Sequence, residues 1–297
     1  MKNYKFDLNK ADTRDFFDEH GFALFRNIFS PDEVKKMRET LNKLFSAKAT
    51  FPGDWDNKDW IKALRADLFN RYPELRWVFY KTEIHQALQK VLGHDIGFVP
   101  ESVAHYKGYG NWHKDTTSQE NDGVKIQYEP DWLMVECAIY LQDNSELYGG
   151  GLDVVPGSHR NQEDQFINSK GLGYISSAIN RVKVPVVQTI KTKNGYHIPS
   201  KAGDFVFFNK KLDHRASPCA AADMPKEKEK LAIFFIGGVN NQHLLEYTNY
   251  ITTRPSYLYM HDYVVDPEFV RECNEQDITL ILPSEKTRSL SSVNKTL

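Results

Sequence analysis

Hydrophobic residues in the first third of the chain recur mostly at the spacing of a helix. The clearest case begins at Ser30, which is followed by Pro31 and Glu33, so that a capping box and a first-turn proline mark a helix start. One hydrophobic stripe continues from there at Val34, Met37, Leu41, Leu44 and Phe45. The pattern predicts a helix that packs this face against a core.

Glycines bound the other helices expected in this region. Gly21 and Gly93 each follow a helical pattern and accept the left-handed conformation that ends a helix. The pattern as a whole predicts helices over residues 12–20 and 82–92, a strand over 22–25, a loop over 52–57 and a broken helical region over 60–72.

From residue 96 onward the pattern changes to short hydrophobic runs bounded by Gly, Pro, Asn or Asp, which is typical of strands. These runs predict strands over residues 97–100, 103–106, 132–140, 151–155, 182–188, 204–208 and 231–237. Helices followed by many short strands indicate a mainly β fold with flanking helices. The sequence contains no convincing linker or repeat, so we expect a single domain.

We expect that domain to span residues 1–297 in three parts. A mostly helical part over residues 1–95 packs on a core over 96–240, and a C-terminal extension follows over 241–297. Residues 161–200 form a long polar insertion between core strands, which predicts a lid or substrate loop. Three further expectations are an aromatic stretch that closes the pocket at 254–261, a solvated Lys-Glu loop at 226–230 and a flexible tail at 284–297.

Composition limits the classes of function. The chain of 297 residues is 40% hydrophobic and 26% charged, which is typical of a globular protein. Its 38 basic and 40 acidic residues leave a net charge of −2, so no overall basic field favours nucleic acid. Three cysteines without a Cys-x-x-Cys pair indicate neither a disulfide framework nor a cysteine zinc site, and the cytoplasm is the expected compartment. No apolar stretch reaches the ~20 residues of a membrane helix.

Candidate chemistry begins with His113 and Asp115. In an extended segment, side chains two residues apart lie on the same face, so an imidazole and a carboxylate converge on one ion. The spacing alone carries no information, because the chain's 10 histidines and 40 acidic residues give about one His-x-acid match by chance. A surface or hydrogen-bonded histidine is the commoner explanation of such a match.

A second histidine strengthens the case. The expected strand over residues 204–208 is followed by His214, and the end of a strand is where a barrel brings a distant ligand to a site. Two histidines and one carboxylate form the facial triad of non-haem Fe(II) oxygenases, and they leave positions open for a cosubstrate and O2. Zinc accepts the same ligands, so a metal-dependent cupin-type hydrolase or isomerase stays open, as does a non-catalytic jelly-roll binding module.

Four segments carry a family resemblance. They are the opening over residues 16–34, the His113-Lys-Asp115 pair, the segment 149–159 that ends in Pro-Gly-Ser-His, and the strand at 202–208 followed by His214. In this order and spacing they resemble the phytanoyl-CoA dioxygenase family. The resemblance implies a double-stranded β-helix, that is, a jelly-roll or cupin-like core. It also implies an oxygenase that uses Fe(II), 2-oxoglutarate and O2, with His113, Asp115 and His214 as the metal ligands and catalytic residues.

The family usually places an arginine on the strand after the second histidine, where it binds the distal carboxylate of 2-oxoglutarate. The matching position here is Lys230, which supplies the charge without the planar fork of an arginine. Lys228, Arg215 and Lys107 are the next candidates for this role. We expect substrate contacts from side chains near the iron pair and on the core strands, namely Tyr106, Thr116, Thr117 and Trp132.

Asp115 also bears on the type of reaction. Related halogenases have a small residue at this position, so the carboxylate favours hydroxylation. We expect hydroxylation of an unactivated C–H bond in a polar or amphiphilic small metabolite, with release of succinate and CO2. Desaturation, cyclisation or epoxidation in natural-product biosynthesis is the alternative outcome at the same iron site. The sequence predicts neither the identity of the substrate nor the oligomeric state.

Overall fold

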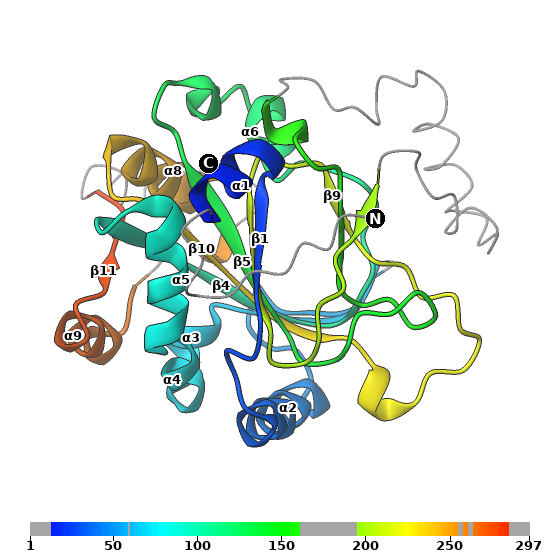
Figure 1. Cartoon of the computed structure of the whole chain (residues 1–297). Coiled ribbons are helices and arrows are strands. Elements are labelled where there is room, and N and C mark those ends of the chain that lie inside the picture. Colours follow the sequence, from blue (N-terminus) through cyan, green and yellow to red (C-terminus); the bar gives the residue numbers. More distant parts are fainter. Residues whose placement is uncertain (1–12, 59, 161–194, 255–257, 261–263, 285–297) are drawn as a thin grey trace.

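The computed structural model describes residues 13–58, 60–160, 195–254, 258–260 and 264–284. Its strands form a large sheet and a small sheet (Figure 1). The large sheet has the order β1-β8-β5-β10-β4-β3-β2, with β11 paired to β4 in parallel, and the small sheet has the order β7-β6-β9. Apart from that of β11, the pairings among the described strands are antiparallel.

The bounds of the elements are as follows. The strands are β1 (Phe22–Phe25), β2 (Trp55–Lys58), β3 (Ile61–Ala66), β4 (Ile96–Gly108), β5 (Met134–Tyr140), β6 (Leu152–Val154), β7 (Tyr196–His197), β8 (Phe205–Asn209), β9 (His214–Ala216), β10 (Leu231–Val239) and β11 (Thr279–Leu280). The helices are α1 (Thr13–His20), α2 (Pro31–Ser46), α3 (Leu68–Arg71), α4 (Arg76–Phe79), α5 (Thr82–Leu92), α6 (Thr117–Asn121), α8 (Gln242–Thr253) and α9 (Pro267–Glu275).

Side chains of the large sheet alternate between two hydrophobic cores. Ile233 and Phe235 of β10 belong to the larger core, which the helices cover, whereas Ala232 packs in a second core with residues of the small sheet. On β8, Val206 and Phe208 join this second core, as the two-residue period of a strand requires. Figure 1 shows α3, α4 and α5 on one side of the large sheet and β9 on the other. The face between the two sheets is therefore the interior of the barrel.

Several predictions of local structure are confirmed. Helices α1, α2 and α5 and strand β1 lie where the sequence places them. The Ser30 hydroxyl accepts a hydrogen bond from the backbone N–H of Glu33, and the Glu33 carboxylate accepts one from the backbone N–H of Ser30. Gly21 ends α1 with φ +82°, and an added Cβ there would lie 2.5 Å from Nδ1 of His159. Strands β5, β6, β8 and β10 match four of the predicted runs to within two residues.

Two predictions for residues 52–72 are wrong in part. Strand β2 covers residues 55–58 and so replaces the second half of the expected loop. Residues 61–66 form β3 where a broken helical region was expected, although α3 lies in the last part of that region. Ala, Leu and Arg in β3 favour a helix locally, but β3 pairs with β4 and buries five of its six residues. Tertiary pairing therefore overrides the local preference, and the N-terminal part contains more strand than expected.

The two strands expected over residues 97–100 and 103–106 are one strand, β4, of 13 residues. Its pairing with β10 shifts between Phe235 and Ile236, because Phe235 faces Ser102 and Ile236 faces Val99. Two residues of β4 therefore have no counterpart on β10, which is a β-bulge. The bulge contains Glu101, whose side chain lines the cavity described below.

Some expectations concern residues outside the described ranges. The strand at 182–188, most of the insertion at 161–200 and nearly all of the tail at 284–297 are among them. The solvated loop predicted at 226–230 is wrong for its last residue, since Lys230 is only 2% exposed. In the part of the chain that the structure describes, no helix combines the length and the apolarity needed to cross a bilayer.

Candidate metal centre and its cavity

Backbone pairing brings the two candidate histidines together. His214 begins β9, and His113 lies in the loop after β4. Their backbones exchange two hydrogen bonds, each with an N–O distance of 2.9 Å, so the residues form an antiparallel bridge. The two imidazole rings are 4.3 Å apart between centroids. Residues a hundred positions apart in sequence are thus held side by side by main-chain contacts.

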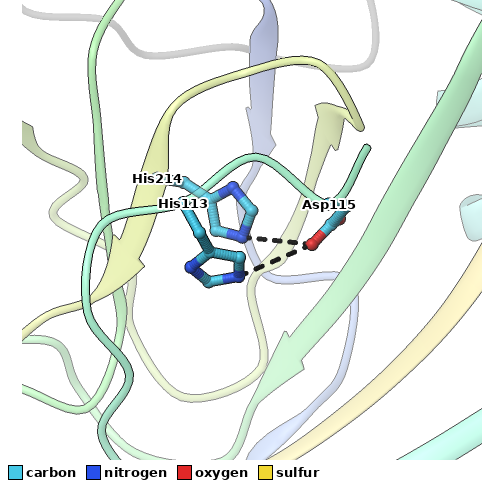
Figure 2. Close-up of side chains that lie close together, drawn as sticks. All are labelled: His113, Asp115 and His214. Carbon is cyan, nitrogen blue, oxygen red and sulfur yellow. Dashed lines mark ion pairs between the residues drawn. The ribbon is translucent and has the colours of Figure 1, made fainter. Parts of the chain in front are cut away.

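Asp115 completes the group (Figure 2). Its Oδ1 atom lies 3.6 Å from Nε2 of His113 and 3.6 Å from Nε2 of His214. One ligand atom from each of the three residues lies within 4.8 Å of the others. Bonds of about 2.1 Å to a single ion place its ligand atoms about 3 Å apart. A small contraction therefore lets all three side chains bind one metal.

The other ring nitrogens fix the orientation of both imidazoles. Nδ1 of His113 lies 2.7 Å from the carbonyl oxygen of Asn111, and Nδ1 of His214 lies 2.9 Å from that of Leu212. A carbonyl oxygen only accepts hydrogen bonds, so each ring donates from Nδ1–H and turns the Nε2 lone pair toward Asp115. This is the arrangement that metal-binding histidines need.

The charge state of the group suits a divalent metal. Burial lowers the pKa of His214 to about 4, so this ring is neutral at pH 7. Burial alone would raise the pKa of Asp115, but the charges of Lys210, His214 and His113 lower it to about 2. Lys210 Nζ also lies 3.3 Å from Oδ2 of Asp115 and leaves Oδ1 for a metal. Nitrogen donors and one carboxylate oxygen on a single face suit Fe(II).

The three side chains open into a cavity of about 510 Å³. This volume lies within the range of about 300–1,000 Å³ that is typical of ligand sites. The cavity wall comes from the inner face of the large sheet, with Tyr140 of β5, Phe208 of β8 and Phe234 of β10. The candidate metal centre therefore sits in a pocket that can take additional ligands.

Lys230 lies in the wall of the same cavity, just before β10. Its Nζ atom is 5.8–5.9 Å from the ring centroids of Tyr109, Tyr140 and Phe234. Among the described residues, Nζ has no carboxylate within ion-pair distance, and burial lowers the pKa of Lys230 to about 7. A buried cation that lacks a counter-charge is costly, so this position is suited to an anionic ligand.

A family model described as phytanoyl-CoA dioxygenase (PhyH) matches residues 17–224, which is more than half of the chain. The chain belongs to the phytanoyl-CoA dioxygenase family. The sequence resemblance is therefore confirmed. The class of enzyme and the cofactors that the resemblance implied for the family are confirmed as well, namely a dioxygenase that depends on Fe(II) and 2-oxoglutarate. The donor set fits Fe(II), and the unpaired Lys230 fits a carboxylate of 2-oxoglutarate.

Curated relatives in this family are ectoine dioxygenases. The enzyme of Bordetella bronchiseptica is 27% identical over 228 residues, which are 68% of this chain and 68% of that protein. The enzyme of Nocardia farcinica is 28% identical over 162 residues. The aligned part covers 48% of this chain and 49% of the Nocardia protein, so the chain spans about half the length of that relative.

The fold is also that of solved oxygenases. The crystal structure of HygX from Streptomyces hygroscopicus, with nickel and 2-oxoglutarate bound, superposes with a TM-score of 0.57 at 15% identity and covers 78% of this chain and 87% of that one. EctD from S. alaskensis superposes with a TM-score of 0.56 at 17% identity, over 80% of this chain and 79% of that one. These similarities concern the fold alone, and they confirm the predicted jelly-roll core.

The other candidate cosubstrate residues of this family member already have partners. Lys107 Nζ lies 2.7 Å from a carboxylate oxygen of Glu229, and Arg215 Nε lies 2.9 Å from Oδ2 of Asp153. Neither these two residues nor Lys228 belong to the cavity wall of the described structure. Of the candidates predicted for 2-oxoglutarate, Lys230 is thus the one that faces the metal centre's cavity. Its role stays a prediction.

The predicted substrate residues are only partly in the cavity wall. Thr117 lines it, whereas Thr116 is buried beside it. Trp132 packs in the larger core, and the Tyr106 hydroxyl donates to Glu229. Alternation along a strand explains Tyr106, because its neighbour His105 takes the inward position.

Sequence reasoning missed several polar residues of the cavity wall, among them Gln119, Glu136 and Lys210. Glu136 and Lys210 form an ion pair of 2.7 Å beneath Asp115. Glu136 is the single charged residue in the hydrophobic run of β5, and a charge inside a buried strand is costly unless it has a function or a partner. That signal was present in the sequence. Nothing in the sequence distinguishes Gln119 from a surface residue.

Proposed function

We propose that this protein is an Fe(II)- and 2-oxoglutarate-dependent dioxygenase that hydroxylates a C–H bond of a small polar metabolite. The observation that carries the proposal is the coexistence, in one cavity, of a three-residue metal site and a buried lysine without a counter-charge. A metal hydrolase has no need of such a lysine. Curated relatives are named ectoine dioxygenases, which supports a small-molecule substrate.

In this proposal each residue has a defined task. His113, Asp115 and His214 hold the metal by one face and leave its other positions open to the cavity. Bound iron supplies the activation of O2, which is coupled to conversion of 2-oxoglutarate into succinate and CO2. Lys210 holds Oδ2 of Asp115 at 3.3 Å and thereby orients the carboxylate. The protein's own contribution is to bind, to orient and to exclude water.

Lys230 anchors the cosubstrate. Its ammonium group pairs with the carboxylate of 2-oxoglutarate that is remote from the metal, and the rings of Tyr140 and Phe234 shield this pair from water. A lysine offers a point charge where an arginine would offer a planar fork, so the position tolerates more freedom of the carboxylate. Loss of water around the pair strengthens the attraction.

The test is formation of succinate by the purified protein with Fe(II), 2-oxoglutarate and a panel of small polar metabolites. We expect one substrate class to stimulate succinate release and to yield a product that is heavier by one oxygen atom. A product that is lighter by two hydrogens would point to desaturation or cyclisation. Absence of 2-oxoglutarate binding to the metal-loaded protein would contradict the proposal.

A further inference from the structure

The cavity has two ends with different chemistry. Lys230 stands just before β10, and Ile236, six residues further along, pairs with Glu136 of β5. With a rise of about 3.3 Å per residue, the backbones of the two positions lie about 20 Å apart along the strand. The Lys230 side chain shortens this span, because its Nζ lies 5.9 Å from the ring of Phe234, four residues further along. The metal site lies toward the Glu136 end, because the Phe208 ring, whose residue pairs with Glu136, packs against the ring of His214 at 4.4 Å.

At this second end, one lysine is shared by two acidic side chains. Lys210 serves two carboxylates at once, at 3.3 Å from Asp115 and 2.7 Å from Glu136. Two other cations of the cavity wall are occupied elsewhere, since Lys114 donates to the carbonyl of Ser158 and Arg254 pairs with Asp122.

Glu136 has no positive partner to itself. In the described part of the chain its ion pair is with Lys210, which also contacts Asp115. A ligand with a positively charged group would give Glu136 a counter-charge of its own.

Gln119 supplies a second, independent observation. It lies on α6, directly after the metal-binding segment, and the residue belongs to the cavity wall although it is only 1% exposed. Neither the amide oxygen nor the amide nitrogen has a hydrogen-bond partner in the described part of the chain. Native proteins satisfy nearly all of their buried polar groups, so an amide of this kind is suited to hydrogen bonding with a ligand.

Aromatic rings complete the wall. Tyr247 and Tyr250 of α8 line the cavity with their rings 6.2 Å apart, and Nζ of Lys210 already lies 5.6 Å from the Tyr247 ring centroid. Carboxylates combined with aromatic faces are the surroundings in which proteins bind organic cations. An anionic group placed here would face Glu136 instead.

We propose that Gln119, Glu136 and Tyr247 form the substrate subsite and that it recognises a positively charged nitrogen group with N–H donors. An ammonium, amidinium or guanidinium group fits this description. The group donates to the Glu136 carboxylate and to the Gln119 amide oxygen, which holds the neighbouring carbon atoms near the metal. This inference rests on the proposed function, because it assigns the substrate of that same site.

The test uses two sets of probes with the same shape and different charge: benzamidinium, benzamide and benzoate, and acetamidinium, acetamide and acetate. Binding to the full-length protein, loaded with Mn(II) and saturated with 2-oxoglutarate, is measured by calorimetry. A charge-assisted hydrogen bond predicts that an amidinium binds about tenfold more tightly than its amide. Glu136→Gln is expected to remove this preference, and Gln119→Leu to weaken amidinium binding.

Matched controls are Glu275→Gln and Gln86→Leu, both at exposed helix positions, which are expected to leave probe binding unchanged. The wild-type comparison stands even if a variant does not fold. Failure of 2-oxoglutarate to bind overturns the proposed function and, with it, this inference. If 2-oxoglutarate binds but neither amidinium is preferred, or if Glu136→Gln keeps the preference, this inference alone is overturned.

Discussion

Lys230→Met removes the charge of the proposed cosubstrate anchor and keeps the length of the side chain. The ammonium is buried against aromatic rings, and burial lowers its pKa from 10.5 to about 7. A lysine whose pKa is lower in the folded state binds its proton less tightly there, so protonation opposes folding. This cost is complete below pH 7 and disappears above pH 10.5. The variant should therefore stabilise the ligand-free protein.

The burial of Lys230 sets the size of two effects, namely the gain in stability and the loss of affinity for 2-oxoglutarate. A fall in pKa from 10.5 to about 7 corresponds, at about 1.36 kcal/mol for each tenfold change in proton affinity, to an upper limit of about 5 kcal/mol. The gain in the free energy of unfolding at pH 6 lies below that limit. In the same variant, 2-oxoglutarate loses a charge-assisted hydrogen bond of about 1.5–3 kcal/mol. Its dissociation constant should rise about 10- to 100-fold.

The assay combines urea unfolding of the ligand-free protein with calorimetric titration of 2-oxoglutarate into the Mn(II)-loaded protein. Lys228→Met is the matched control, because Lys228 belongs to the same charged run but forms only a half-exposed ion pair of 3.7 Å with Asp143. We expect Lys230→Met to be more stable and to bind 2-oxoglutarate weakly, and the control to change neither quantity strongly. A Lys230→Met protein that is less stable and binds 2-oxoglutarate normally would refute the reasoning.

Three further predictions follow from the structure. Because 2-oxoglutarate pairs with protonated Lys230, whose pKa is about 7, its dissociation constant should rise only about twofold between pH 6 and 7 and then up to tenfold per pH unit. A flat calorimetric profile to pH 9 would contradict this. Asp115→Ala should weaken Mn(II) binding by more than about 100-fold, whereas Asp143→Ala at a half-exposed position should not, and equal affinities in a metal titration would count against the site. Ser30→Ala should cost about 1 kcal/mol in urea unfolding through loss of the α2 cap, and an unchanged midpoint would show that the cap contributes nothing.

Local signals in the sequence were sufficient for much of the fold. Ser30, Pro31 and Glu33 specify the start of α2 through contacts within one turn, and hydrophobic runs rich in aromatic and β-branched residues mark β8 and β10. Elements whose structure depends on distant partners were not predictable in this way. The segment that forms β3 becomes a strand only because β4 pairs with it. The residues of β9 carry no strand pattern, since this strand is only three residues long and is defined by β6.

The residues of the candidate site also fall into those that the sequence could predict and those that depend on distant contacts. His113, Asp115 and His214 were found because their spacing and order match a family pattern. Lys230 was found by position, but its burial could not be inferred, since it ends a run of charged residues. Gln119 and Lys210 enter the cavity through the packing of segments distant from the strands that carry Glu136 and Lys230. Such convergence depends on the assembled barrel and leaves no trace in local sequence.

The central claim is that two histidines and one aspartate hold Fe(II) in a position where 2-oxoglutarate chelates it. Anaerobic titration of 2-oxoglutarate into the Fe(II)-loaded protein tests this directly, because chelation of Fe(II) by a 2-oxo acid produces a visible charge-transfer band. The account predicts that the band appears at one equivalent in the wild-type protein and is absent from His214→Ala. A wild-type protein that binds one equivalent of Fe(II) but develops no band at saturating 2-oxoglutarate would contradict it.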